Sequence, residues 1–370
     1  MRDFLPSSAV PSRHDGFFAT FDWFGAVSGS HFVDMTVDQL KRYEAENVQY
    51  VEFMVSAWCP NDRERFAKAV GEAVDDAAKL AALEASGLAD CVAAKRNDLT
   101  AAIDKVRTSL GCDVPVPQPG CSVTFRYIAQ IYRDNPPDDV FVQTATAVAL
   151  IRAEPRLVAL NLAGPEDYLV ARRNYTRQME IIRFLAKDVP VALHAGELWL
   201  GLVPPSDLSF HIRQAIEIAD AQRIGHGVSL AFERDAEGLL AEMRARPVVV
   251  EISLTSNDLI LGVRGKDHLL PSYLAAGVPV VLSTDDAGVS RIDLTNEYFR
   301  AARDYALGYR ELKTIARNAL RYSFLDAEQK RDQLERFDQR TAEFERSVVG
   351  RQSPLRNAVA LIKAAVTFPH

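Results

Sequence analysis

The sequence has no long apolar run, no excess of positive charge and no clustered cysteines. None of its hydrophobic segments reaches the length of a membrane span, and its first residues lack the charged-then-apolar order of a secretion signal. The formal net charge of -7 argues against a general affinity for nucleic acid or anionic membranes, because both need a basic face. We therefore predict a small-molecule ligand and a cytoplasmic location, or a secreted or periplasmic one if a signal peptide is missing.

The few cysteines and the missing phosphate loops exclude further classes. No two of the four cysteines have C-x-x-C spacing, so the sequence predicts neither a zinc ribbon nor a thioredoxin-like redox motif. A disulfide between Cys91 and Cys112 is one candidate pairing. The sequence also lacks the G-x-G-x-x-G and G-x-x-x-x-G-K-[ST] loops that bind nucleotide phosphates. Their absence makes an open doubly wound sheet a weaker candidate than a barrel.

Strand-like and helix-like segments alternate along the chain. Of its 370 residues, 48% are hydrophobic, which is enough for a large core. Seven short, nearly continuous apolar runs are typical of parallel strands buried on both faces; they span residues 48–56, 123–132, 157–164, 191–197, 223–229, 248–257 and 278–286. Because helical periodicity fills the intervals, we predict a TIM-type (β/α)8 barrel with seven of its eight strands identifiable.

We predict a single barrel domain over residues 1–370. Residues 60–122 are alanine-rich and charged, and they predict a helical insertion between the first two strands. From about residue 309 onward, a second alanine-rich and charged stretch predicts helices that pack on the outside of the barrel. No internal repeat is detectable in the sequence.

Polar residues recur where the last four apolar runs end. They are His194, Glu197, His226, Ser256, Asn257, Asp285 and Asp286. In a barrel the carboxyl ends of the strands converge on one face, so we expect these side chains to meet there. Histidine nitrogens and aspartate oxygens bind zinc-like cations, and a glutamate or a second histidine can transfer protons. The set therefore suits metal-assisted hydrolysis.

Each of these residues also has a purely structural interpretation. The sequence G-H-G around His226 is typical of a tight turn, and the T-D-D segment is typical of a helix cap. We predict no metal-binding role for His14 and His31. We also predict none for His211, His268 and His370, which we expect in structural or solvated positions.

The order of several motifs resembles the adenosine deaminase family, which consists of metal-dependent barrel enzymes of the amidohydrolase type. The similarity covers nearly the whole chain and includes an aromatic segment from Phe17 to Gly29 that resembles the family's helical lid. The motifs that carry the resemblance are, in chain order, LNLAGPE, HAGE, RIGHG, SLTSN and STDDAG.

The resemblance implies a role for each matching polar residue. His194 and Asp285 would bind a catalytic zinc ion, and Glu197 would donate a proton to a purine ring nitrogen. His226 would position the attacking hydroxide and act as a base, and Asp286 would hold the attacking oxygen or the other ring nitrogen. For the proton donor we predict a pKa raised by partial burial beside the base.

The resemblance also implies contacts to the substrate. The backbone of Gly164 would contact the edge of the base. An apolar gate over the nucleoside would be formed by Phe17, Phe18 and Phe21.

The sequence departs from the family at its start. The family's first strand ends in a His-x-His pair that supplies two metal ligands, whereas no H-x-H occurs here. We interpret the difference as a truncated start; the alternatives are a non-catalytic relative and a strand supplied by another chain. One histidine and one aspartate should bind zinc more weakly than the family's four-ligand site.

The implied reaction is hydrolytic deamination of adenosine, or of a related aminopurine nucleoside, to inosine and ammonia by a zinc-activated water. The alternatives are a deaminase of adenine or of a nucleotide, and a metal-free protein that binds purines without catalysis. We predict one zinc ion per chain, a small purine nucleoside as the partner, and no binding to nucleic acid or membranes. The sequence predicts no particular oligomeric state.

Overall fold

Seven short strands, each parallel to its neighbours, form the centre of the fold. The computed structural model describes residues 12–366, and the strands within this range are β1 (Tyr50–Ser56), β2 (Thr124–Tyr132), β3 (Leu157–Ala163), β4 (Ala192–Ala195), β5 (Arg223–His226), β6 (Val249–Ile252) and β7 (Val280–Leu282). The number agrees with the seven predicted strands. The strand predicted over 248–257 ends early, because residues 254–257 begin a helix.

The strands pair in chain order within two sheets. One sheet has the order β1-β2-β3 and the other β4-β5-β6-β7, and a parallel bridge between Leu160 and Val191 links β3 to β4. Among the described residues no ladder joins β7 to β1. The register places Ala195 opposite His226, so neighbouring strands end at the same edge.

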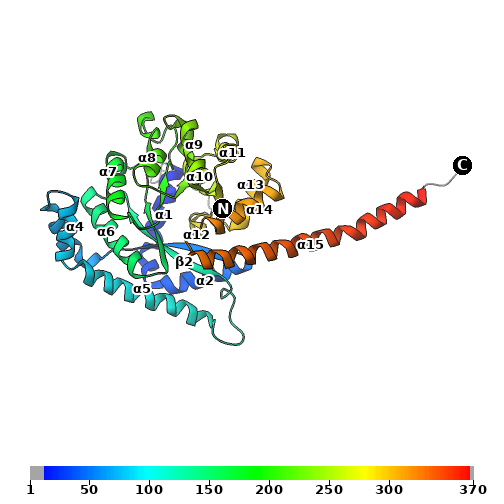
Figure 1. Cartoon of the computed structure of the whole chain (residues 1–370), viewed down its shortest axis with the longest axis horizontal. Coiled ribbons are helices and arrows are strands. Elements are labelled where there is room, and N and C mark those ends of the chain that lie inside the picture. Colours follow the sequence, from blue (N-terminus) through cyan, green and yellow to red (C-terminus); the bar gives the residue numbers. More distant parts are fainter. Residues whose placement is uncertain (1–11, 367–370) are drawn as a thin grey trace. The chain divides into compact units, whose positions relative to one another are not determined.

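Helices precede, separate and follow the strands along the chain, and within residues 12–324 they surround the strands (Figure 1). They are α1 (Arg13–Ser28), α2 (Phe32–Ala45), α3 (Arg63–Gly71), α4 (Asp76–Ala85), α5 (Leu88–Leu110), α6 (Pro137–Ala153), α7 (Leu169–Leu185), α8 (His211–Glu217), α9 (Ala236–Ala245), α10 (Leu254–Leu261), α11 (Leu270–Ala275), α12 (Ala287–Ser290), α13 (Leu294–Tyr305), α14 (Tyr309–Arg321) and α15 (Ala327–Val366).

Local sequence determines several helix ends. Asp75 and Asp293 precede α4 and α13, and each side chain accepts a hydrogen bond from a backbone N–H of the first turn. Helix α5 ends at Gly111, whose φ of 61° is a left-handed conformation that glycine adopts without strain.

The strand interiors supply the core. Ile131, Leu160 and Leu162 are fully buried, which explains why β2 and β3 read as continuous apolar runs rather than alternating ones. Helix α14 contacts β7, where Asn318 Nδ2 donates to the Val280 carbonyl at 3.2 Å.

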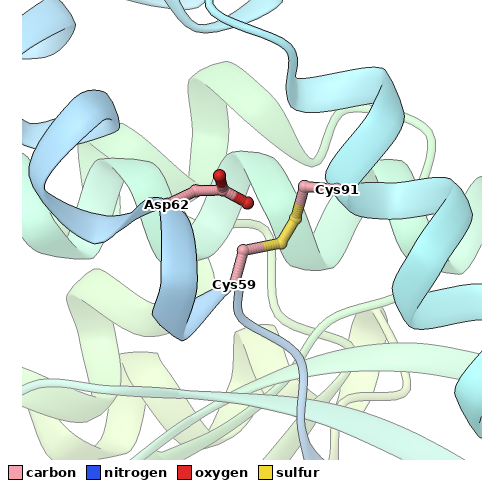
Figure 2. A group of neighbouring side chains, drawn as sticks. All are labelled: Cys59, Asp62 and Cys91. Carbon is pink, nitrogen blue, oxygen red and sulfur yellow. A yellow bond between two sulfur atoms is a disulfide. The ribbon is translucent and has the colours of Figure 1, made fainter.

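Three helices and two disulfides lie between β1 and β2. Cys59 in the loop after β1 is bonded to Cys91 in α5, with Asp62 beside the pair (Figure 2). Cys112 is bonded to Cys121 and closes the loop after α5. The candidate pairing of Cys91 with Cys112 is therefore wrong, because Cys91 lies in the first turn of α5 and Cys112 lies beyond its end, so the 23-residue helix keeps them apart.

The chain divides into two compact units, Met1–Phe324 and Leu325–His370. Helix α15, in the second unit, is a single helix of 40 residues. None of the helices in the described part of the chain combines the length and apolar character that crossing a membrane requires. The boundaries of the single domain stay a prediction.

A buried ion cluster joins the two sheets. Arg223 at the start of β5 contacts Glu52 of β1 at 2.6 Å and Glu251 of β6 at 2.9 Å. Its guanidinium also lies 4.0 Å from the ring centre of Phe324. Because β1 and β5 belong to different sheets, the pair with Glu52 holds the sheets together across the interior.

We predict that Arg223→Met destabilises the protein by about 3 to 5 kcal/mol, because it leaves two carboxylates without their buried counter-charge. The free energy of unfolding in urea measures the loss. Adding Glu52→Gln should recover part of it, whereas Arg42→Ala, in the exposed pair with Asp38, should cost less than about 1 kcal/mol. Equal losses at the exposed and the buried pair would contradict this interpretation.

Candidate active site

Three side chains of types that can bind a metal ion meet at the carboxyl ends of the strands. His194 is in β4, His226 ends β5 and Asp285 follows β7. Their potential ligand atoms all lie within 4.8 Å of one another, and the two imidazole ring centres are 5.0 Å apart. The structure therefore brings together residues that are up to 91 positions apart in the sequence, since 285 − 194 = 91.

Backbone geometry turns two of these side chains at the strand ends. His226 has a φ of 69° and Asp285 a φ of 53°, which is a sparsely populated region for residues other than glycine. Such strain occurs mainly where the surrounding structure fixes a residue for function. The turn expected at G-H-G is therefore present, and it places an imidazole among the other polar groups.

Neighbouring polar groups orient the side chains of His194 and Asp285. His194 Nδ1 lies 2.9 Å from Asn161 Oδ1, and Ser256 Oγ donates to Asp285 Oδ2 at 2.7 Å. Because Asn161 Oδ1 accepts from Nδ1, the other ring nitrogen of His194 keeps its lone pair. Burial, followed by the nearby His226, holds the pKa of His194 well below its usual value, so the imidazole is neutral and can bind a metal ion.

Two further carboxyl groups lie near this cluster, the buried Glu197 and the half-buried Asp286. Burial, and then the charge of Asp285, raises the pKa of Glu197 well above its usual value, which confirms the direction predicted for this group. Burial, and then the charge of Asp285, also raises the pKa of Asp286. Asp286 occupies the N-cap position of α12, but its side chain makes no capping hydrogen bond, so the interpretation of this residue as a helix cap is wrong.

A third carboxylate, Glu166, holds the loop that carries Glu197. Its oxygens accept hydrogen bonds from the backbone N–H of Gly196 at 3.1 Å and of Glu197 at 2.7 Å. His211 Nδ1 lies 2.6 Å from the same carboxylate, and Arg133 Nη1 lies 3.3 Å from it. Burial raises the pKa of Glu166, but the charges of Arg133 and His211 outweigh it and lower the pKa to about 2.

The same arginine holds the backbone of β4. Arg133 Nη2 donates to the carbonyl oxygens of Leu162 at 2.8 Å and of His194 at 2.5 Å. Arg133 and Glu166 are both fully buried, so this pair fixes the ends of β3 and β4 relative to each other.

Glycine is required inside the HAGE motif. Gly196 has a φ of 73°, and a Cβ atom at this position would lie 2.7 Å from Ile212 Cγ1 and 2.8 Å from Ser229 Oγ. Any other residue would push the loop away from α8 and so displace Glu197.

Helix α1 carries a cluster of aromatic side chains. Phe17 is buried and Phe18 and Phe21 are half-buried, with ring centres 5.5 to 6.5 Å apart. Helix α1 packs on α10, the helix that carries Ser256. His14 Nε2, in the first turn of α1, lies 3.0 Å from Asp167 Oδ1 in the loop after β3.

This loop also contains Gly164, the residue expected to contact a base. It follows the last residue of β3, and its φ of 97° is accessible mainly to glycine. Its backbone therefore lies at the same edge of the strands as His194.

Comparison with known proteins identifies the family. The family model for adenosine deaminase matches residues 11–340, which is most of the chain. The chain belongs to the adenosine deaminase family. This confirms the resemblance of the sequence motifs, and with it the TIM-type barrel and membership of a deaminase or amidohydrolase class of enzymes.

Curated relatives of the family match part of the chain. An aminodeoxyfutalosine deaminase from Streptomyces coelicolor is 34% identical over 218 residues, which is 56% of this chain and 51% of that protein. An adenosine deaminase from Enterococcus faecalis is 30% identical over 187 residues, 50% of this chain and 51% of that protein. The chain thus matches about half the length of these relatives.

Solved structures share the fold over a longer range. An N6-methyl-AMP deaminase from Arabidopsis thaliana has a TM-score of 0.62 at 21% identity, and the match covers 89% of this chain and 84% of that one. An amidohydrolase from Burkholderia ambifaria, solved with bound Zn, has a TM-score of 0.59 at 16% identity and covers 86% and 75%. At these identities the similarity establishes the barrel fold.

Sequence reasoning missed several hydrogen-bond partners of the candidate site residues. Asn161 and Glu166 lie inside the LNLAGPE motif, but their partners, His194 and Gly196, are 33 and 30 residues further along the chain. His268, expected in a structural or solvated position, is buried with 2% exposure and lies beside Asn257. His211 is structural, as expected, and His370 lies outside the described residues.

We predict that the docking of α1 weakens as the pH rises. Burial lowers the pKa of His14, but the hydrogen bond to Asp167 outweighs it, so the pKa is raised above 6.5. A raised pKa means that the stabilisation is fully present below pH 6.5 and is lost as the pH passes through the folded-state pKa. Hydrogen exchange of the α1 amides, corrected for intrinsic rates, should accelerate across this range. In His14→Gln the corrected rate should be independent of pH; a pH effect as large as that of the wild type would contradict the prediction.

Proposed function

We propose that this chain catalyses the hydrolytic deamination of an aminopurine nucleoside, with adenosine as the reference substrate, to inosine and ammonia. One observation carries the proposal: a chain of the adenosine deaminase family holds two imidazoles and a carboxylate within 4.8 Å of one another, with the buried carboxyl group of Glu197 3.5 Å from His226 Nδ1. Relatives whose names describe adenosine, aminodeoxyfutalosine and N6-methyl-AMP deaminases support an aminopurine as the substrate class.

The donor set supplies two ligands for a zinc ion, fewer than the three protein ligands usual at a catalytic zinc site. An imidazole with a free ring nitrogen and a carboxylate fixed by a hydroxyl group are zinc ligands of the usual kind, and we assign them as His194 and Asp285. A related barrel was solved with bound Zn. When bound here, zinc would lower the pKa of a water molecule toward 7.

The chain's own carboxyl groups supply the proton chemistry. In its protonated form Glu197 can donate a proton to the ring nitrogen beside the amino-bearing carbon, which neutralises the charge that develops there. Its Oε1 makes no hydrogen bond within the described residues and remains available to a ligand. We assign His226 and Asp286 to the attacking oxygen, and the backbone of Gly164 to the base edge.

The aromatic residues of α1 complete the proposed site. Helix α1 packs on α10, and we assign its residues Phe17, Phe18 and Phe21 to an apolar gate that excludes water around the base.

A direct test measures zinc content and turnover in the purified 370-residue chain. We expect mass spectrometry to detect bound zinc when the ion is supplied in excess, because two protein ligands hold it more weakly than four, and we expect conversion of adenosine to inosine, which is followed by chromatography. His194→Ala together with Asp285→Asn should lose both. A panel of 2′-deoxyadenosine, adenine and AMP selects among the substrates. A chain that binds purines without zinc and without turnover would overturn the proposal in favour of a binding protein.

We predict that Glu197→Gln retains zinc but lowers kcat by about 10² to 10⁴-fold, because glutamine cannot donate a proton. In the metal-free chain the same variant should be more stable than the wild type at neutral pH. The wild-type carboxyl group has a raised pKa, so it loses stability as the pH rises from 4.5 toward the folded-state pKa. Thermal unfolding at pH 4.5 and pH 7.5 measures the difference. A variant with wild-type kcat would remove Glu197 from the mechanism.

A further inference from the structure

A chain of three buried polar side chains leads from the protein interior to the candidate site. Asn257 Nδ2 lies 2.9 Å from His226 Nδ1, and Asn257 Oδ1 lies 3.0 Å from His268 Nε2. The backbone N–H of Leu270 donates to His268 Nδ1 at 3.1 Å. The three side chains are at most 3% exposed, so water does not compete for these hydrogen bonds.

The backbone N–H of Leu270, at one end of this series of hydrogen bonds, determines the direction of every other bond in the series. The amide of Leu270 can only donate, so His268 Nδ1 must accept and carries no proton. A neutral imidazole holds one proton, which is then on Nε2 of His268. That nitrogen donates to Asn257, so the oxygen of the amide must face His268 and the NH2 group must face His226.

The NH2 group of Asn257 in turn fixes the state of His226. Because an amide NH2 only donates, His226 Nδ1 must accept, and the ring proton of neutral His226 is on Nε2. Glu197 Oε1, at 3.5 Å from the same Nδ1, makes no hydrogen bond that would compete. Burial lowers the pKa of His268 to about 4 and lowers the pKa of His226 as well, in agreement with neutral rings.

We propose that Asn257 and His268 are positioning residues that hold His226 as the Nε2–H tautomer, which makes it a hydrogen-bond donor to the attacking oxygen rather than a metal ligand. These hydrogen bonds from Leu270 through His268 and Asn257, which we call the relay, occupy Nδ1 of His226. They leave Nε2–H, which has no lone pair for a metal ion or for an incoming proton, so His226 does not keep the role of base that the family resemblance implies. The three potential ligands of the cluster thus divide into two ligands, His194 and Asp285, and one donor. The role of His226 toward the attacking oxygen rests on the proposed function, whereas its tautomer does not.

The tautomer can be measured directly. Two-bond ¹⁵N–¹H correlation spectra of the full chain labelled with ¹⁵N-histidine distinguish the two neutral tautomers, and loss of a signal in His226→Gln assigns His226. We expect the Nε2–H form in the metal-free wild type. An Nδ1–H or doubly protonated His226 at pH 7.5 would overturn the proposal without any further variant.

Two substitutions test the relay itself. Asn257→Asp replaces the NH2 group with an acceptor, so His226 should change to the Nδ1–H form, and kcat should fall by about 10² to 10⁴-fold with little change in KM. His268→Gln retains one acceptor for Leu270 and one donor for Asn257, so it should keep the wild-type tautomer and most of the activity. Asn174→Asp, the same change on the surface of α7, should alter neither property.

The outcomes separate the relay from the proposed reaction. If Asn257→Asp folds and its His226 stays in the Nε2–H form, the relay is wrong, even in an active enzyme. If Asn257→Asp does not fold, the comparison of His268→Leu with His268→Gln tests the relay instead. Loss of the Nε2–H form of His226 only in His268→Leu supports the relay. Equal populations of that form in the two variants overturn it. A wild type with the Nε2–H tautomer but no deaminase activity overturns the proposed function and leaves the relay in place.

Discussion

The geometry of the candidate site depends on one buried carboxylate. Glu166 receives the backbone N–H groups of Gly196 and Glu197 and is balanced by Arg133 and His211. A carboxylate without these partners would be too costly to bury, so the network forms as a unit or not at all. Because Arg133 also holds the carbonyl of His194, one set of buried charges fixes both ends of the HAGE motif.

Two glutamates in direct contact show how the environment separates structural from chemical roles. Glu166 lies against an arginine and a histidine, and its pKa falls to about 2. Glu197 is also buried, and its pKa rises because of burial and the charges of Asp285 and Glu166 itself. The permanent charge of Glu166 therefore serves to anchor the loop, and it also helps to keep the neighbouring carboxyl group protonated.

The sequence predicts strands and strand ends, which depend on local patterns of apolar and polar residues. The structure adds hydrogen bonds and disulfides between residues that are far apart in the sequence. Apolar runs with polar ends were sufficient to locate seven strands and to bring His194 and Asp285 to one face. The same pattern extended the strand at 248–257 too far, because Ser256 and Asn257 are buried in a helix rather than in a strand. The hydrogen bond of His268 could not be predicted, because its partner Asn257 is 11 residues away and lies in α10. The disulfide partners depend likewise on how α5 lies relative to the loop after β1.

Distance alone does not distinguish the two imidazoles of the cluster, but their hydrogen bonds do. His194 gives its Nδ1 proton to the side-chain oxygen of Asn161, whose own NH2 group lies 3.1 Å from the sulfur of Met54, so Nε2 of His194 keeps a lone pair. His226 meets the opposite end of an asparagine and keeps a proton on Nε2. Two asparagines presented in opposite orientations thus give neighbouring histidines opposite tautomers, one suited to a metal ion and the other to an oxygen that attacks beside it.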